Sequence, residues 1–298
     1  MTAHTPAAAV PETLPAVMLP GSDSDADLER RFGGLRRLYG DAGYLRVRAA
    51  RVAVIGLGGV GSWAVEALAR SGVARLVLVD LDQVAESNIN RQVQALGSTL
   101  GLAKAEALRR RIADIHPGCE VLAVEEFASP DNWPGLLPAE VDVLIDACDQ
   151  SSAKLALAAW ALAGGVPLVC VGAAGGKQLA HKVDVADLAE VSHDPLLASL
   201  RQRLRKQGSA ARTGPIGLCC VFSRESVALP MPAGNFACAS DGSLNCQGYG
   251  STVTVTATFG LVAAGEALRL CRAGAGKAAV LPQQVPSAEA PRLAKTPA

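Results

Sequence analysis

The sequence predicts an α/β protein built on a doubly wound, mostly parallel sheet with a C-terminal extension of strands and helix. Three observations support this prediction. Short apolar runs alternate with helical stretches, which is the pattern of parallel strands joined by crossover helices. A glycine-rich turn joins the run at 51–55 to a helix. The next apolar run ends on an acidic residue, Asp80, about 20 residues after the glycines, a spacing that recurs in doubly wound folds.

The first half of the predicted fold consists of apolar runs and the helices between them. Residues 27–49 are helical in character and are broken at glycines. Proline and glycine at 117–118, and two glycines at 164–165, predict the ends of two later helices. The predicted order is helix 27–49, strand 51–55, helix 60–71, strand 76–80, helix 101–115, strand 121–124, strand 141–147, helix 151–163 and strand 166–171.

The pattern changes after Gly176. The predicted elements are then a strand at 177–185, a basic helix at 195–207, a mobile loop at 208–218, short strands at 220–223 and 227–229, and a long terminal element at 251–270. This last element is apolar but carries Glu266 and Arg269, which favours a buried helix, or a strand followed by a helix, over a membrane span.

Composition divides the chain into one domain and two tails. Residues 1–27 are rich in Ala, Pro, Ser and Asp and are expected to be a disordered extension, and residues 274–298 a disordered tail. Residues 28–273 are expected to form a single domain with a basic insertion at about 195–218. The first residues lack the basic region of a secretory signal, so we expect a cytoplasmic protein with no membrane span.

Charge and cysteine content exclude some classes of protein. Lys plus Arg and Asp plus Glu each number 28, which argues against a general coat for nucleic acid but allows a local basic patch. No CxxC pair occurs among the eight cysteines, which argues against a structural zinc site. Several cysteines lie in apolar runs, which favours a reducing compartment.

The glycine-rich turn is a candidate phosphate site. It contains Gly56, Gly58, Gly59 and Gly61 in a GxGGxG pattern between a strand and a helix. Such glycines let the backbone approach a phosphate, and the start of the following helix supplies N–H donors. Asp80 is then expected to bind the hydroxyl pair of a ribose. The turn alone would suit many Rossmann-like proteins.

The residues after Asp80 favour a nucleoside triphosphate over a nicotinamide cofactor. Arg91 and Lys104 are candidate cations for the phosphates and the reaction, and Asp82 and Asp149 are candidate ligands of a metal or of water. A reacting triphosphate needs such fixed charges because backbone amides alone cannot balance it. Each has an ordinary alternative, because Lys104 could be a solvated helix lysine and Asp149 a helix cap.

Five motifs in this order resemble the ubiquitin-activating-enzyme superfamily, with its ThiF/MoeB-like bacterial members. They are GxGGxGS, a strand ending in DxD, SNxNRQ, GxAK and DAxD. The resemblance implies ATP and Mg²⁺ as cofactors, with Asp80 on the ribose and Asp149 on the magnesium. It also implies a phosphate site made by Asn88, Arg91, Gln92 and Lys104. Gln150 departs from the Asn or Ser that usually follows the last Asp.

Longer strings resemble one branch of that superfamily, the tRNA threonylcarbamoyladenosine dehydratases. They are RFGGLRRLYG at 31–40, GGVGSWAVEALARSG at 58–72, TLGLAKAE at 99–106 and a set of strings between 187 and 260. This resemblance implies an ATP-dependent cyclisation of a modified adenosine beside the tRNA anticodon, through adenylation of its carboxylate and release of AMP. The alternatives are an adenylating enzyme for a ubiquitin-like sulfur carrier, an NAD-dependent oxidoreductase and a non-catalytic binding module.

The resemblance also implies partners. It implies a homodimer in which an arginine near the N-terminus, Arg31 or Arg37, reaches the partner's ATP. It leaves open a cysteine desulfurase or other sulfur-transfer partner, and a monovalent cation held by carbonyls of the late glycine-rich loops. No DNA partner is expected.

A basic stretch is the candidate tRNA surface. It comprises Arg201, Arg203, Arg205, Lys206 and Arg212, with no acidic residue between the first and the last. Contact with tRNA phosphates needs only positive charge. A solvated helix face is the equally weighted alternative.

Four further residues are expected to be structural. Cys220 and Cys246 are interpreted as small core residues because the reaction requires no enzyme thiol. His181 and His193 are interpreted as structural or exposed, and not as general bases.

Overall fold

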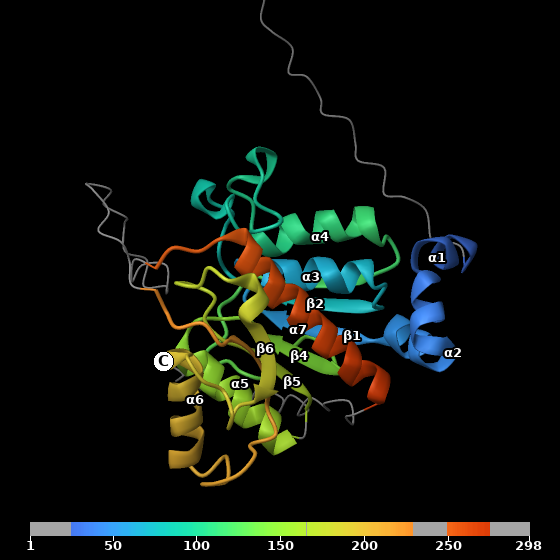
Figure 1. Ribbon diagram of the computed structural model, residues 1–298. Helices are drawn as coiled ribbons and strands as arrows, with labels where there is room; N and C mark the ends of the chain where they lie inside the picture. Colours follow the sequence, from blue (N-terminus) through green and yellow to red (C-terminus); the bar gives the residue numbers. More distant parts are fainter. Residues whose placement is uncertain (1–24, 165, 229–248, 275–298) are drawn as a thin grey trace, which may run out of the picture.

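The computed structural model describes residues 25–164, 166–228 and 249–274. In this part of the chain a seven-stranded sheet has the order β3-β2-β1-β4-β5-β7-β6 (Figure 1). Every neighbouring pair is parallel except β6 and β7, which are antiparallel. The strands are β1 Arg51–Ile55, β2 Arg75–Val79, β3 Glu120–Val124, β4 Val143–Asp146, β5 Leu168–Val171, β6 Val183–Asp187 and β7 Cys219–Ser223. The predicted fold class is confirmed.

Helices cover both faces of the sheet. Helices α3, α4 and α7 lie on one face and α5 and α6 on the other, while α1 and α2 pack at the end where the strands begin (Figure 1). The helices are α1 Asp25–Phe32, α2 Gly34–Ala49, α3 Gly61–Arg70, α4 Lys104–Ile115, α5 Ser151–Gly164, α6 Pro195–Lys206 and α7 Val253–Ala273, with short 3-10 turns η1 Glu86–Asn88, η2 Gly97–Thr99 and η3 Ala180–Lys182.

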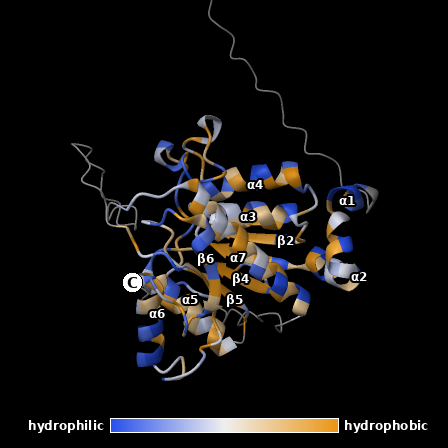
Figure 2. Cartoon of the chain, in the orientation of Figure 1, coloured by the Kyte–Doolittle hydropathy of each residue, from blue (hydrophilic) through white to orange (hydrophobic). Residues whose placement is uncertain are grey.

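Each strand divides its side chains between two cores. In β1, Val52 and Val54 face α3 and α7, whereas Ala53 and Ile55 face α5. Successive side chains of a strand point to opposite faces, so a sheet that is covered on both faces needs continuous apolar strands. Figure 2 shows the apolar strands in the interior and the polar residues on the outer helical surfaces.

Helix α7 meets the length and composition expected of a membrane-spanning helix, but 44% of its apolar window is buried inside the protein. Val255, Phe259 and Ala263 are fully buried against the sheet and α3. A Cβ atom at Gly260 would lie 2.8 Å from Trp63 Cβ, so glycine permits the close crossing of α7 over α3. The prediction of a buried terminal helix is confirmed.

The predicted strand at 177–185 is wrong in its first half. The backbone turns at Gly176, whose φ is +70°. The N–H groups of Gln178 and Leu179 then donate to the carboxylate of Glu225 instead of to a neighbouring strand. Residues 180–182 form η3, and β6 begins at Val183.

The predicted strand at 227–229 is also wrong over its described residues. Ala228 N donates to Gly176 O at 2.8 Å, but no ladder follows. Residue 229 lies outside the described residues, as do residues 1–24, the tail from 275 and Cys246. The predicted disordered extension over 1–27 is wrong for residues 25–27, which begin α1.

Candidate nucleotide site

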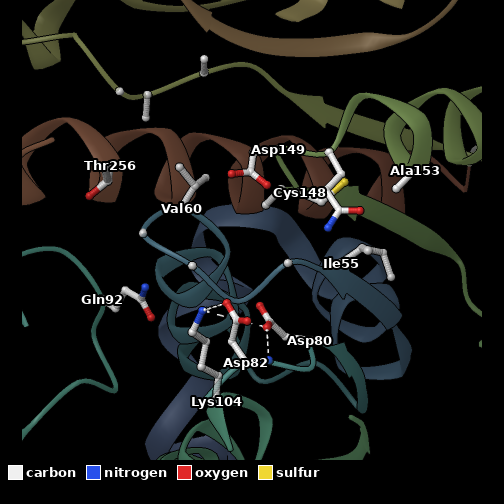
Figure 3. Close-up of a pocket in the computed structure, with 18 of the residues that line it drawn as sticks. Ile55, Val60, Asp80, Asp82, Gln92, Lys104, Cys148, Asp149, Ala153 and Thr256 are labelled. Carbon is white, nitrogen blue, oxygen red and sulfur yellow. Dashed lines mark hydrogen bonds and ion pairs between the residues drawn. The ribbon is translucent and has the colours of Figure 1, made fainter. Parts of the chain in front are cut away.

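A cavity of about 340 Å³ opens at the carboxyl ends of β1, β2, β4 and β5. This is the edge at which doubly wound folds bind their ligands. Residues from the glycine turn, the loop after β2, the start of α4, the loops after β3, β4 and β5, and the start of α7 line it. Figure 3 shows Asp80, Asp82 and Lys104 on one side of the glycine turn, with Cys148 and Asp149 on the other.

The glycine turn forms the floor of this cavity. Gly56 has a φ of +87°, and a Cβ atom there would lie 2.9 Å from the backbone of Ala147 and Cys148. Gly58 faces open space, so a phosphate can approach its backbone. Helix α3 begins at Gly61, and its first N–H groups add partial positive charge at the same place.

Asp80 is fixed by backbone donors. Its Oδ2 accepts a hydrogen bond from Leu57 N at 2.6 Å, and its Oδ1 accepts one from Asp82 N at 2.9 Å. Burial raises the pKa of Asp80, against the opposing effect of Lys104 and of these two amides. The carboxylate is therefore held rigidly at the end of β2, where it lines the cavity.

Lys104 is buried, which excludes the solvated helix lysine considered above. It is the first residue of α4, and its Nζ lies 2.6 Å from Asp82 Oδ2 and 4.0 Å from Asp80 Oδ1. A pair of 2.6 Å between charged groups is a strong hydrogen bond. The ammonium group is thereby placed at the wall of the cavity beside the glycine turn.

The loop after β2 brings three more predicted residues to the cavity. Asn88 Oδ1 accepts a hydrogen bond from Ala85 N and so closes the turn η1. Arg91 donates to Ser87 O at 2.7 Å, and its own carbonyl accepts from the indole of Trp63. Gln92 also lines the cavity, with its side chain buried.

Asp149 lines the opposite wall and fits a magnesium site. Among the described residues no group of three or more His, Cys, Asp or Glu side chains could hold a metal by itself. Mg²⁺ commonly takes only one or two carboxylates and completes its shell with water and substrate phosphates. Asp149 in a cavity that also contains Asp82 and the glycine turn provides such an incomplete donor set.

Sequence reasoning assigned no role to two residues beneath this wall, although Asp146 is the first residue of the DAxD motif. Asp146 and Lys154 are completely buried and form an ion pair of 2.8 Å. A signal was present, because Lys154 is the one charged residue in α5, whose sequence is SSAKLALAAWALAG.

The basic stretch on and after α6 divides into two groups. Arg201 donates to the carbonyls of Leu188 and Val191, so its guanidinium group has a role within the fold. Arg203 donates to Ser151 O at 2.9 Å and Arg205 to Gly214 O at 3.2 Å. The two remaining members, Lys206 and Arg212, are exposed.

The two N-terminal arginines also differ. Arg31 donates to Ile115 O at 2.8 Å, at the end of α4. Arg37 is exposed on α2. They belong to α1 and α2, which pack at the end of the sheet where the strands begin (Figure 1), whereas the cavity is lined at the carboxyl ends of the strands.

Among the described cysteines and histidines, Cys148 lines the cavity, and Cys220, His181 and His193 do not. Cys220 is fully buried in β7, which confirms the prediction. Burial raises the pKa of the Cys148 thiol well above its ordinary value, although this residue lines the cavity. His181 and His193 are exposed and are not among the described cavity-lining residues.

Lys177 occupies a point where late-loop carbonyls converge. Its ammonium donates to His193 O at 2.9 Å and to Glu225 O. Burial lowers its pKa.

Fold and cavity together define a Rossmann-like nucleotide-binding protein whose cavity combines a glycine turn with basic and acidic side chains. The model of the ThiF family matches residues 31–288. The tRNA threonylcarbamoyladenosine dehydratase of Escherichia coli is 40% identical over 257 residues, which span 83% of this chain and 96% of that protein. The chain belongs to the ThiF family and, within it, to the family of the tRNA threonylcarbamoyladenosine dehydratases.

Solved structures agree with this assignment. The crystal structure of the E. coli dehydratase in complex with ATP has a TM-score of 0.75, with 84% of this chain and 96% of that chain covered at 40% identity. A more distant relative, an adenylyltransferase and sulfurtransferase of Drosophila willistoni, is 32% identical over 119 residues, or 40% of this chain and 26% of that protein.

Proposed function

We propose that this protein uses ATP to cyclise N6-threonylcarbamoyladenosine next to the anticodon of tRNA. One observation carries the proposal. A single cavity brings together the glycine turn, Asp80, Arg91, Lys104 and Asp149 from three loops and the start of α4, in a chain that matches nearly the whole length of a dehydratase.

The reaction takes place in two steps. In the first, the threonylcarbamoyl carboxylate attacks the α-phosphorus of ATP, the bond to the pyrophosphate oxygen breaks, and an acyl-adenylate forms. In the second, a nitrogen of the same substituent attacks the acyl carbon, AMP leaves, and the nitrogen loses its proton. Adenylation is needed because hydroxide is a poor leaving group, whereas AMP is a good one. The second nucleophile is already attached, so proximity lowers its barrier.

The side chains of the cavity divide this task. Asp80 accepts hydrogen bonds from the ribose, since its carboxylate is held by two amides at the end of β2. Lys104 and Arg91 balance the charge that develops on the phosphate oxygens. Asn88, Gln92 and the backbone of Gly58 hold the remaining phosphate oxygens. Asp149 would hold Mg²⁺, which supplies further charge neutralisation when it is bound.

The basic residues of the α6 region other than Arg201 are the proposed tRNA contact. Arg203 reaches Ser151, the residue after the cavity-lining Gln150, so this surface adjoins the mouth of the cavity. Arg203, Arg205, Lys206 and Arg212 contact phosphates of the anticodon arm, whereas Arg201 supports the loop after β6.

The assembly and location of the protein complete the proposal. We propose a cytoplasmic homodimer in which Arg37 reaches the partner's site, because Arg31 is engaged at the end of α4. A sulfur-transfer partner and a monovalent cation remain predictions.

The test is a comparison of substrates. With ATP, purified protein should release AMP and pyrophosphate in the presence of tRNA that carries threonylcarbamoyladenosine, and not with the same tRNA lacking the modification. Mass spectrometry should find the cyclised nucleoside in tRNA from cells that express the wild type, and not in tRNA from cells that express Arg91→Ala. Adenylation of a ubiquitin-like carrier protein instead would establish the alternative function.

A further inference from the structure

The strands β4 and β5 end above a completely buried ion pair. Asp146, the last residue of β4, and Lys154 in α5 both have zero solvent exposure, with 2.8 Å between Nζ and Oδ2. Removing two charges from water is costly, and an apolar pair of similar size often gives equal or greater stability. The stability of the core therefore does not explain why these two residues are present.

Helix stability does not explain Lys154 either. The residue lies in the first turn of α5, where the helix dipole disfavours a positive charge. Burial is the largest effect and disfavours the charged ammonium, but the carboxylate of Asp146 and smaller contributions from Cys170 and Cys148 oppose it, and the net pKa of Lys154 is raised. The ammonium is thus kept charged by its partner at the base of the cavity wall.

The ammonium group joins the ends of the two strands. Lys154 Nζ donates to Val171 O at 2.9 Å and approaches Asp146 O at 3.4 Å, and these are the last residues of β5 and β4. The chain continues from Val171 into residues 172–175, which line the nucleotide cavity. Lys154 therefore fixes the position from which this loop departs.

The carboxylate of Asp146 fixes the loop after β4. Asp146 Oδ1 accepts hydrogen bonds from Cys148 N at 3.2 Å and Cys148 Sγ at 2.9 Å. Cys148 immediately precedes Asp149. Ala147 N donates to Ile55 O at 2.8 Å, and the adjoining peptide packs against Gly56. The same ion pair thus supports the segment that carries Asp149 and the surface on which the glycine turn rests.

We propose that the Asp146–Lys154 pair is a positioning element for adenylation, which sets the separation between the segment of Asp149 and the loop 172–175. The inference rests on the proposed function. Neither residue is among those that line the cavity, so both act through their neighbours.

The half of the cavity around Asp80 and Lys104 is built on β2 and α4 and does not contact the pair. Triphosphate chemistry depends on both halves, whereas the ribose of AMP depends mainly on the Asp80 half.

The test uses a variant that leaves no lone buried charge. Lys154→Met would leave the buried carboxylate of Asp146 without its partner, and the protein could then fail to fold. The variant to be tested is therefore the double variant Asp146→Asn/Lys154→Met. The control is Leu157→Met, which lies in the same helix and is equally buried. For each protein we would measure the thermal midpoint, the dissociation constant of AMP by calorimetry, and kcat and KM of ATP–pyrophosphate exchange with modified tRNA.

We expect the double variant to remain folded and to bind AMP within about threefold of the control, while kcat of exchange falls about tenfold to a hundredfold, the range that small misplacements cause. An unchanged kcat in the folded double variant would overturn the inference and leave the proposed function intact. A parallel loss of AMP binding and kcat would also overturn it, because it would indicate a purely structural role. A wild type without exchange activity would refute the proposed function and the inference with it.

Discussion

Lys104 and Asp82 form an ion pair of 2.6 Å that joins the start of α4 to the residues after β2. Lys104 is buried, whereas the carboxylate of Asp82 is about half exposed. The ammonium group is therefore oriented by one carboxylate at the rim while it stays within 4.0 Å of a second, Asp80. This geometry gives a charged side chain a fixed direction before it meets a phosphate.

Replacement of Lys104 should remove phosphate stabilisation and leave ribose binding in place. We expect Lys104→Met to lower kcat/KM for ATP in pyrophosphate exchange about 100-fold or more, the effect of losing one preorganised donor. Affinity for AMP should change much less. The matched control is Lys182→Met, which removes an exposed lysine in η3, outside the cavity lining and the basic stretch. Equal losses for ATP and AMP would contradict the phosphate role.

Asp80 should determine the preference for a ribose. For the wild type, KM for 2′-deoxyATP should exceed that for ATP about tenfold, since a hydrogen bond to a charged group is lost. In Asp80→Asn this preference should shrink, because the amide has one acceptor and Leu57 N competes for it. Steady-state pyrophosphate exchange with ATP and with 2′-deoxyATP, for the wild type and for Asp80→Asn, measures how far the preference for the 2′-hydroxyl depends on Asp80. An unchanged ratio in the variant would show that the hydroxyls bind elsewhere.

The exposed basic residues should affect tRNA and not ATP. We expect Lys206→Glu/Arg212→Glu to raise KM for modified tRNA about tenfold or more at low salt, with KM for ATP unchanged, and the effect should diminish as salt increases. Arg30→Glu/Arg110→Glu is the control, because it changes the net charge equally on exposed residues of α1 and α4. The two double variants should be compared by filter binding. Identical tRNA affinities of the two double variants would show that the basic stretch is a solvated surface and does not contact tRNA.

Glu66 should make stability depend on pH. Burial raises the pKa of Glu66, but hydrogen bonds from Arg111 and Arg70 outweigh burial, and the net pKa lies below its ordinary value. The ionised carboxylate therefore stabilises the fold above about pH 4, and this contribution is lost as pH falls through the lowered pKa. We expect Glu66→Gln to cost about 1 kcal/mol at pH 7, since both arginines are partly exposed.

Thermal unfolding at pH 7 and pH 3.5 measures this effect. The difference between Glu66→Gln and the wild type should shrink at the lower pH. Glu120→Gln, which removes a more exposed pair with Arg75, should show little change at either pH. A Glu66→Gln difference that grows on acidification would contradict the assigned sign.

Cysteine chemistry should be dispensable. Burial and the adjacent Asp146 raise the pKa of Cys148, so its thiol stays protonated and is a poor nucleophile at neutral pH. We expect Cys148→Ala to retain kcat within about threefold, with Cys220→Ala as a buried control that tests the packing cost of a missing sulfur. Loss of kcat in Cys148→Ala alone, with a normal thermal midpoint, would show that the thiol is needed for the reaction, either as a reacting group or through its hydrogen bond to Asp146.

Local patterns predicted most of the parallel half of the fold. The strand at 51–55, the glycine turn and the helix at 151–163 are specified by apolar runs and by the turn residues beside them. The segment after Gly176 was less predictable, because its outcome depends on Lys177 and Glu225. These two residues are far apart in sequence, and their hydrogen bonds replace a strand ladder with a turn.

The residues of the site were predictable where they belong to motifs that occur in a fixed order along the sequence. Asp80, Lys104 and Asp149 line one cavity, as their motif order suggested. The contact of Lys104 with Asp82 was not predictable, because the direction of a lysine side chain depends on packing. Asp146 was hidden for a different reason. A charged residue at the end of an apolar strand resembles a surface residue until its partner, eight positions later, is seen to share its burial.

The lining of the nucleotide cavity extends in sequence from Ile55 to Thr256 on α7. Strand β7 also enters the sheet between β5 and β6, although both precede it in the chain. During translation, the ribosome must therefore release nearly all of the domain before the sheet can close and the last wall of the cavity can form. Ligand binding cannot assist the early nascent chain, and the newly made protein must reach its final topology through its own packing.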